Sequence, residues 1–320
     1  MRSAESRAVV VRISDFQPSA YMNKHLIRLL RPQQWLKNAF VLTPLFFDRH
    51  VADWHYAWPC IQACMAFCLT ASGIYCFNDI HDAEADRQHP VKRLRPVACG
   101  AVSRRAAYAV MTAAWALAFM LIALGNFASP RGVAAMMLLY VVMNVAYCVR
   151  LKQIAILDVF IIAAGFVLRI VVGGLAAGIV LSHWIILTTF LLALFLALAK
   201  RRDDVVIRAT LGAEPRRGVE RYCSNQGASA DFLGSAISVL GSVTIMCYIL
   251  YTVSGEVVKR IGCDYLYATS AFVLAGMLRY MQLTLVEQKS GSPTQVVLHD
   301  RFIQVCIFGW IAMFSIMLYG

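Results

Sequence analysis

Long apolar blocks, separated by short charged segments, dominate the pattern of the chain. Nine of these blocks approach the roughly 20 residues that an α-helix needs to cross a bilayer. They lie near residues 33–48, 55–77, 106–124, 132–149, 155–178, 183–199, 232–253, 264–286 and 302–319. Only helices and closed barrels satisfy their backbone polar groups inside lipid. The pattern therefore predicts an all-α polytopic membrane protein with nine transmembrane helices.

The composition excludes the common soluble classes. Hydrophobic residues make up 60% of the 320 residues and charged residues only 15%, against about 25% charged residues in an ordinary globular protein. With a mean hydropathy of +0.63, neither a soluble enzyme, a disordered chain nor a nucleic-acid-binding domain fits. The net charge of +12 could still indicate an anionic partner, so its distribution matters.

The positive charges fall on one side of the predicted membrane. If the spans alternate in direction, all but five of the 30 Lys and Arg residues lie in five segments on the same side: 1–37, 78–105, 150–153, 200–221 and 279–301. The others are Arg169 inside a span, and Arg49, Arg131, Lys259 and Arg260 on the opposite side. Cytoplasmic loops carry the Lys and Arg excess. We therefore expect a cytoplasmic N-terminus, an outer C-terminus and no nucleic-acid partner.

The chain is expected to form one domain preceded by a tail. Residues 1–20 lack the apolar core and the cleavage site of a secretory signal, so they are interpreted as a flexible cytoplasmic tail. Residues 21–320 then form a single transmembrane domain. Its long cytoplasmic loops, 78–105 and 200–230, offer room for a site.

The strongest chemical signal follows the second span. Asp79, Asp82 and Asp86 are spaced i, i+3, i+7 and share one face if the segment is helical, and Asn78 and Tyr75 extend that face toward the membrane. Carboxylates this close repel one another unless a cation lies among them. Mg²⁺ usually binds through one or two carboxylates and substrate phosphates, so the cluster indicates a site for a magnesium-bound diphosphate.

A basic segment follows the acids. Lys92, Arg93 and Arg95 are positioned to hold anionic oxygens that the metal leaves uncovered, through charge-assisted hydrogen bonds. The alternative is a solvated loop in which acids and bases simply offset each other.

Two ionisable residues lie at membrane depth. Asp158 and Arg169 are separated by close to three helical turns, about 16 Å along the axis. Charges inside a span are costly and usually face a polar cavity. We interpret Arg169 as a phosphate ligand and Asp158 as an orienting or charge-balancing residue, with Tyr147 and Lys152 flanking the mouth of the cavity. A structural ion pair between helices is the alternative.

Four stretches carry a resemblance to a known family. They are Arg31-Pro-Gln-Gln-Trp-Leu-Lys37-Asn38, Asn78 to Pro96, Tyr147 to Gly174, and Pro293 to Arg301. Asn78-Asp79-x-x-Asp82-x-x-x-Asp86 looks like the first aspartate motif of the UbiA superfamily of intramembrane prenyltransferases. Within it, the Lys92-Arg93-x-Arg95-Pro ending resembles the branch of decaprenyl-phosphate phosphoribosyltransferases. The resemblance runs from about residue 25 onward.

The resemblance implies a fold and a reaction. It implies a UbiA-like bundle, here with nine helices, in which Asp82 and Asp86, supported by Asn78 and Asp79, hold Mg²⁺. The expected enzyme transfers 5-phosphoribose from phosphoribosyl pyrophosphate to a polyprenyl phosphate, releasing pyrophosphate. Lys37 alone could be an interfacial anchor, but the resemblance makes it a diphosphate ligand.

The resemblance also implies a cellular setting. The expected place is the bacterial inner membrane, with the active site facing the cytoplasm. The product would lie on the route to lipid-linked arabinose donors for a cell-wall arabinan or a nodulation signal. A bundle of this kind could also associate into homo-oligomers through its lipid-facing helices.

The end of the sixth span departs from the wider superfamily. Typical prenyltransferases have a second aspartate-rich motif there, whereas this chain has Lys200-Arg201-Arg202-Asp203-Asp204, as the phosphoribosyl branch does. Extra cations suit a second phosphate group more than a second metal ion, so Lys200, Arg201 and Asp204 are expected at the substrate. Anchoring under the positive-inside rule is the alternative.

Two other function classes remain open. A conventional UbiA-type prenyltransferase, which moves a prenyl group from its diphosphate to an aromatic or other acceptor, shares the first motif and the fold. A transporter or channel would suit the intramembrane charges, but the hydropathy pattern has no half-to-half repeat and the aspartate motif would be unexplained.

Overall fold

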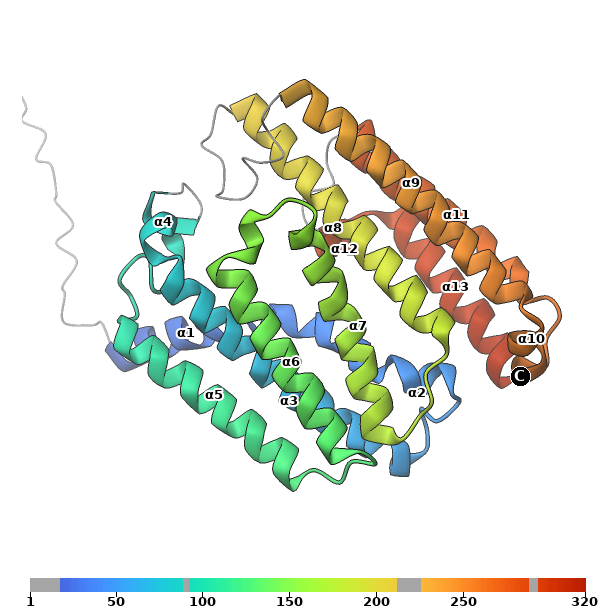
Figure 1. The fold of residues 1–320 in the computed structure, drawn as a ribbon, viewed down its shortest axis with the longest axis horizontal. Helices are drawn as coiled ribbons and strands as arrows, with labels where there is room; N and C mark the ends of the chain where they lie inside the picture. The colour runs from blue at the N-terminus through green and yellow to red at the C-terminus, as the bar shows by residue number, and fades with distance from the viewer. Residues whose placement is uncertain (1–17, 89–91, 212–225, 288–292) are drawn as a thin grey trace, which may run out of the picture.

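The computed structural model describes residues 18–88, 92–211, 226–287 and 293–320, and within these ranges the chain is helical without strands (Figure 1). The long helices are α3 (Trp54–His81), α5 (Arg104–Leu124), α6 (Pro130–Val149), α7 (Leu157–Ala177), α8 (His183–Leu211), α9 (Gln226–Val253), α11 (Ser270–Leu285) and α13 (Arg301–Tyr319). The short ones are α1 (Pro18–Leu30), η2 (Pro32–Leu42), α2 (Thr43–Phe47), α4 (Ala83–Arg87), η3 (Lys92–Leu94), η4 (Leu151–Gln153), α10 (Gly255–Ile261), η6 (Leu266–Thr269) and α12 (Pro293–His299). The proposed tail, residues 1–20, lies almost wholly outside the described ranges, as does much of the loop 200–230.

Seven described helices are long and apolar enough to cross a membrane, or eight if α10 and the segment Leu266–Leu285, bent by 99°, count as one span. The prediction of an all-helical membrane protein is confirmed at this level. The first predicted span, 33–48, does not form one α-helix of membrane length. It is the 3₁₀ helix η2 followed by the five-residue helix α2. Pro44 explains the break, because its ring clashes with the carbonyl of residue i−4 in an α-helix.

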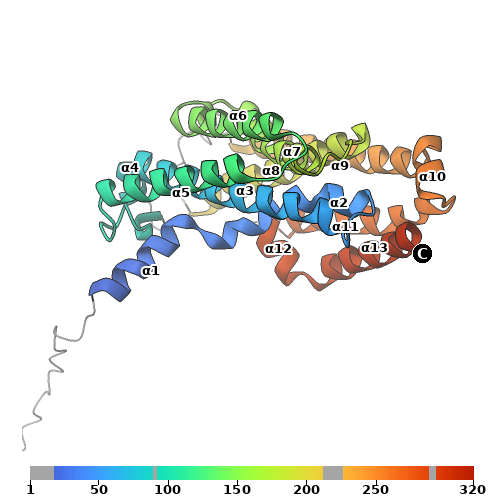
Figure 2. The same cartoon turned by 90° about the horizontal axis from the view of Figure 1, so that it is seen from below.

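The long helices run back and forth between two ends of the molecule. In Figure 1, α3 ends, α6 ends, α7 begins and α8 ends toward the upper left, which we call the charged end. The α5–α6 and α7–α8 turns, α2, α10 and the C-terminus lie toward the other side, the opposite end. Figure 2 shows α1 leaving the bundle near the charged end.

Helix α7 joins the two largest hydrophobic clusters. Its first turns, including Val159 and Ala163, pack against α8 and belong to a cluster that also contains side chains of α9 and α11. Further along the same helix, Val172 and Ala176 pack with α3, α6 and η2. Side chains from two halves of the chain therefore meet on α7. This helix carries Asp158 in its first turn and Arg169 further along.

In η2, the residues that face the bundle recur every three positions, because a 3₁₀ helix has three residues per turn. Trp35, Asn38 and Val41 face the bundle, whereas Leu36 and Ala39 are exposed. The indole N–H of Trp35 donates to Ser72 Oγ of α3 at 3.0 Å. Runs of 3₁₀ helix this long are uncommon, so tertiary contacts must hold the segment in this form.

One such contact needs a glycine. The backbone of η2 comes so close to α7 that a methyl group on Gly173 would lie 1.9 Å from the carbonyl oxygen of Val41. Small residues permit this kind of approach between membrane helices. Gly173 therefore sets the distance between η2 and α7.

We predict that Gly173→Ala displaces η2 and lowers the free energy of unfolding by about 1–3 kcal/mol, the usual cost of overpacking. Gly165→Ala is the matched control on the same helix, because the nearest atom to its added methyl lies at an ordinary 3.5 Å. Thermal unfolding in detergent, followed by tryptophan fluorescence, measures both. Equal midpoints for the two variants would contradict the assigned contact.

Candidate active site

The acids at the end of α3 lie beside arginines. Asp79 is 1% exposed, and its Oδ1 accepts from Arg31 and lies 3.4 Å from Nη1 of Arg95. The same Arg95 nitrogen donates to Asp86 Oδ2 at 2.5 Å. One guanidinium thus joins Asp79 of α3 to Asp86 of α4. The Arg31 guanidinium also lies over the ring of Tyr75, 5.0 Å from its centroid.

Asp82 stands where α3 ends and α4 begins, and it has a different partner. Its Oδ1 accepts from Lys152 Nζ of η4 at 2.6 Å. The thiol of Cys148, at the end of α6, lies 3.4 Å from Asn78 Oδ1. The helix break at Asp82 means that the three carboxylates do not share one straight face. Asp79 and Asp86 meet Arg95, and Asp82 meets Lys152.

A second cluster of charged side chains lies between α7 and α8. Arg201 is 6% exposed and donates from Nε to Asp158 Oδ2 at 2.5 Å. It also donates to Asp204 at 3.1 Å and to the Tyr147 hydroxyl at 3.2 Å. Charged hydrogen bonds from α6, α7 and α8 therefore meet at one guanidinium, with Lys200 exposed beside it.

Arg169 lies deeper and has several partners. It donates to Asn38 Oδ1 at 2.9 Å, to the Gly165 carbonyl at 2.7 Å and to the Tyr140 hydroxyl at 3.0 Å. Three aromatic rings, including that of Phe67, have centroids within 5.2 Å of its guanidinium carbon. These contacts favour a structural role for Arg169, through Asn38 rather than through the ion pair considered above. The phosphate-ligand role stays a prediction.

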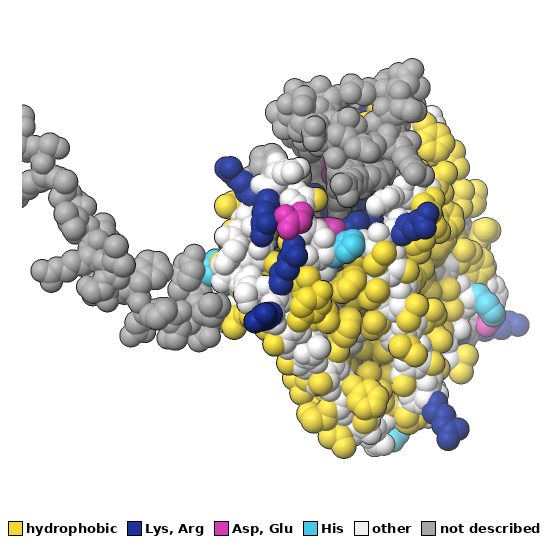
Figure 3. Space-filling view, turned by 60° about the vertical axis from the view of Figure 1, so that its left-hand side comes forward, with side chains coloured by type: hydrophobic (Ala, Val, Ile, Leu, Met, Phe, Trp, Pro, Cys, Tyr) yellow, Lys and Arg dark blue, Asp and Glu magenta, His cyan; other side chains and the backbone are white. Residues whose placement is uncertain are grey.

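Lys37 and the basic loop complete the predicted set. The charge of Lys37 interacts with those of Lys200, Arg169 and Arg31, so this side chain lies among the groups described above. In the loop after α4, Arg95 contacts the acids directly, while Arg93 is exposed. Figure 3 shows Lys and Arg side chains gathered with an acidic one on this side of the molecule, next to a mostly hydrophobic flank.

The fourth resembling stretch connects α11 to α13. Asp300 caps α13 by accepting from the Ile303 N–H at 2.9 Å and accepts from Arg279 Nη2 at 2.8 Å. Burial acts to raise the pKa of Asp300, but these hydrogen bonds outweigh it and hold the pKa below its ordinary value. The contacts indicate a structural connection.

Three residues of the charged end escaped the sequence analysis as site residues: Arg31, Asn38 and Tyr140. Arg31 has φ of 52°, a conformation that non-glycine residues adopt rarely, and it directs its guanidinium to Asp79. The sequence did contain a signal for Arg31, since it precedes Pro32 directly before the first apolar block. Nothing in the sequence marked Tyr140, whose role depends on α6 packing against α7.

The donor chemistry of the acids fits a hard cation. Asp79 Oδ2 is buried and accepts no hydrogen bond from the described residues, and carboxylate and amide oxygens are hard ligands. Among the residues that the structure describes, no three His, Cys, Asp or Glu side chains are close enough to hold a metal alone. A magnesium ion that also binds substrate phosphates needs only one or two carboxylates.

These features define a multi-pass helical membrane protein with acids and cations concentrated at one end. The sequence pattern described as the UbiA prenyltransferase family matches residues 40–217. The decaprenyl-phosphate phosphoribosyltransferase of Mycolicibacterium smegmatis is 32% identical over 318 residues, covering 95% of this chain and 96% of that protein. The chain therefore belongs to the UbiA prenyltransferase family.

Two further comparisons agree with this placement. Nodulation protein NoeC of Azorhizobium caulinodans is 36% identical over 152 residues, which cover 47% of each chain. A UbiA homolog from Archaeoglobus fulgidus, solved bound to DMAPP and Mg²⁺, superposes with a TM-score of 0.63 at 18% identity. That superposition covers 91% of this chain and 98% of the other, and it shows the shared fold.

We predict that Asp158→Asn destabilises the protein by about 3–5 kcal/mol, because it leaves Arg201 as a buried cation without its closest carboxylate. Asp204→Asn is the matched control, since Asp204 is 34% exposed and contacts the same guanidinium; it should cost about 1 kcal/mol or less. Unfolding midpoints in detergent measure both effects. Similar midpoints would show that Asp158 is not the main partner of Arg201.

Proposed function

We propose that this protein transfers 5-phosphoribose from phosphoribosyl pyrophosphate to a polyprenyl phosphate and releases pyrophosphate. The proposal is supported first by a relative of that named activity that matches nearly the whole chain. The observation that carries it is the concentration of cations around the acids. Arg95, Lys152 and Arg201 contact acids directly, and Lys37 lies near Lys200. Two phosphorylated substrates present anionic oxygens that such cations can hold through charge-assisted hydrogen bonds.

The acids are assigned to the donor's diphosphate. Asp82 and Asp86, supported by Asn78 and Asp79, would hold Mg²⁺, which acts as a Lewis acid on the leaving diphosphate when bound. Arg95 and Lys152 already contact these carboxylates. Cations oriented in advance stabilise charge that develops on a leaving group without reorganising. Lys37, Tyr75, Lys92 and Arg93 are assigned to the same end of the donor.

The second cluster of charged side chains is assigned to the remaining phosphates. Lys200 and Arg201 would hold the 5-phosphate of the donor or the phosphate of the lipid. Asp158, Asp204 and Tyr147 would keep Arg201 in place through their hydrogen bonds. Arg169 would act as a further phosphate ligand, since its hydrogen bonds to Asn38, Gly165 and Tyr140 use three of its five N–H groups.

The reaction itself needs little proton transfer. The bond between the anomeric carbon and the diphosphate oxygen breaks, and an oxygen of the lipid phosphate forms the new bond at that carbon. This nucleophile is an anion at neutral pH, so no general base has to deprotonate it. Charge stabilisation and positioning therefore supply the catalysis, which agrees with a site made of cations and carboxylates.

The main rival is prenyl transfer from a prenyl diphosphate. The family assignment and the fold suit both reactions equally. The sequence at the end of α8 favours the phosphoribosyl reaction, because Lys200, Arg201 and Arg202 precede the acids there. Cations at this position suit a substrate phosphate better than a second metal ion.

We further propose nine spans with the charged end in the cytoplasm of the bacterial inner membrane. A 3₁₀ helix rises about 2.0 Å per residue and an α-helix about 1.5 Å. Helices η2 and α2, with 11 and 5 residues, could therefore extend for about 30 Å, the thickness of the hydrocarbon core. With Leu266–Leu285 and the seven long helices, that makes nine. The soluble donor then meets the site from the cytoplasm.

The transfer assay tests the function. We predict that purified protein with Mg²⁺ converts labelled phosphoribosyl pyrophosphate and polyprenyl phosphate into a lipid-soluble labelled product. Asp82→Ala should lower the rate at least a hundredfold by removing a carboxylate next to the reacting diphosphate, an effect of about 3 kcal/mol. Glu84→Ala is the control, because its side chain is 71% exposed on the adjoining helix. Activity with a prenyl diphosphate donor instead would support the rival reaction.

Cysteine labelling tests the orientation. In a variant with Cys99 and Cys263 changed to Ser, which lowers the native background at the two ends, Gly255→Cys should react with a membrane-impermeant maleimide added to intact cells. Gln88→Cys should react only after permeabilisation, because it lies at the charged end. Labelling of Gln88→Cys in intact cells would invert the proposed topology.

A further inference from the structure

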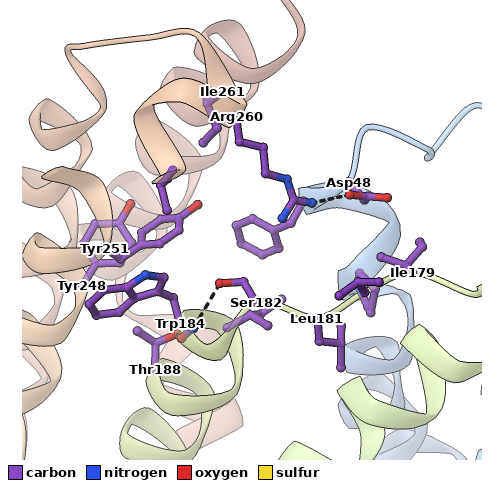
Figure 4. Close-up of a pocket in the computed structure, with 15 residues that line it drawn as sticks. Asp48, Ile179, Leu181, Ser182, Trp184, Thr188, Tyr248, Tyr251, Arg260 and Ile261 are labelled. Carbon is purple, nitrogen blue, oxygen red and sulfur yellow. Dashed lines mark hydrogen bonds and ion pairs between the residues drawn. The ribbon is translucent and has the colours of Figure 1, made fainter. Parts of the chain in front are cut away.

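A pocket of about 90 Å³ lies at the opposite end, far from the acids (Figure 4). It forms where α2, α8, α9 and α10 meet the turn between α7 and α8. Its walls are largely aromatic and aliphatic, with Phe47, Leu181, Trp184, Tyr248 and Tyr251 among the lining residues. In Figure 4 Tyr251 and Trp184 stand across from Leu181, and Arg260 spans the space above them. The assigned reaction uses none of these residues.

The cations of the opposite end gather at this pocket. The topology leaves only four Lys or Arg residues on that side, and three of them lie on α10 or in the turn after α2: Arg49, Lys259 and Arg260. Arg260 lines the pocket and pairs with Asp48. Arg49 donates from Nη2 to the Ile261 carbonyl at 2.8 Å. A side depleted of cations thus places Arg260 in the wall of one apolar pocket and Arg49 next to Ile261, another residue of that wall.

Both guanidiniums retain donors for a ligand. Each has five N–H groups, and within the described part of the chain the hydrogen bonds of Arg49 and Arg260 come from Nη2 alone. Arg260 is 47% exposed. Arg49 has φ of 63°, in the left-handed region, where non-glycine residues persist only when their surroundings hold them. The fold therefore holds Arg49 against Ile261, which lines the pocket, in spite of backbone strain.

We propose that this pocket binds an anionic phospholipid of the membrane leaflet at the opposite end. Arg49 and Arg260 would contact its phosphate, and part of one acyl chain would lie against Trp184 and Tyr251. Lipid phosphates lie at the depth where helices end, and Trp and Tyr favour that interface. Guanidinium groups hold phosphates through charge-assisted hydrogen bonds, so charge and apolar lining fit the two parts of one molecule.

The bound lipid would lie next to the place where α2, near the start of the chain, packs against α13, near its end. Around the pocket, Phe46 and Phe47 of α2 pack against Trp310 and Phe314 of α13. Tyr319 donates to the Phe46 carbonyl at 3.0 Å. A lipid held by residues of α2, α8 and α10 adds contacts among these three helices, next to the packing of α2 against α13. It should therefore raise the thermal stability of the protein.

The test compares lipids and variants of the full chain. Delipidated protein in detergent is titrated with phosphatidylglycerol or phosphatidylcholine of the same chains, and binding is followed by native mass spectrometry and by the unfolding midpoint. Phosphatidylglycerol should bind more tightly and raise the midpoint by several degrees. Arg49→Ala with Arg260→Ala should weaken that binding about tenfold or more, as expected for lost charge-assisted contacts. Arg131→Ala, an exposed cation of the same side on α6, should keep wild-type binding.

A second variant tests the pocket without touching the cations. Thr188→Trp fills the space next to Trp184 and should abolish the stabilisation by phosphatidylglycerol while leaving Arg49 and Arg260 in place. Equal binding of the two lipids, unchanged binding in the double variant, or stabilisation by inorganic phosphate alone would each overturn the proposal. Selective binding of polyprenyl phosphate instead would overturn the choice of lipid. Since the readouts are binding and unfolding, the result does not depend on the proposed reaction.

Discussion

The pairing of charges that are shielded from water is the constraint on which this structure depends. Asp79, Asp158 and Arg201 are each at least nine-tenths buried, and removing one ion from water costs several kcal/mol unless partners compensate. The partners come from distant segments. Arg31 precedes η2, and Asp158 of α7 meets Arg201 of α8. These pairs therefore fix the start of η2 against the end of α3, and the start of α7 against α8.

The same pairs make a site out of helix ends. Membrane helices satisfy their own backbone groups, so a bundle of apolar helices offers little to bind a phosphate. Here the acids hold the cations in fixed orientations. An anionic substrate then meets positive groups whose side-chain entropy has already been lost on folding. Substrate phosphates must therefore compete with the carboxylates for these cations. In the proposed reaction, Mg²⁺ would neutralise the carboxylates and so leave the cations to the phosphates.

The sequence predicts the class of the protein well, and it predicts the contacts among the candidate site residues poorly. Apolar blocks of span length predicted the membrane helices, and the distribution of Lys and Arg placed Asp82, Lys152 and Arg201 on one side, where they lie together at the charged end. Periodicity could not show that α3 ends at Asp82, because helix breaks depend on local hydrogen bonds. It also missed the contact of Arg169 with Asn38, which depends on how η2 packs against α7. Residues 33–48 form the 3₁₀ helix η2 and the short helix α2 instead of one long α-helix, because hydropathy does not distinguish a 3₁₀ helix from an α-helix.

The form of η2 has a consequence for the deep arginine. If its 11 residues became α-helical, the segment would shorten by about 5 Å, because the rise falls from about 2.0 to 1.5 Å per residue. Successive turns would also drift around the axis, so Trp35 and Val41 could no longer face the bundle together. Asn38 would then turn away from Arg169, leaving a buried cation without one of its three hydrogen bonds. The buried charge of Arg169 on α7 thus favours the 3₁₀ form of η2 over an α-helix.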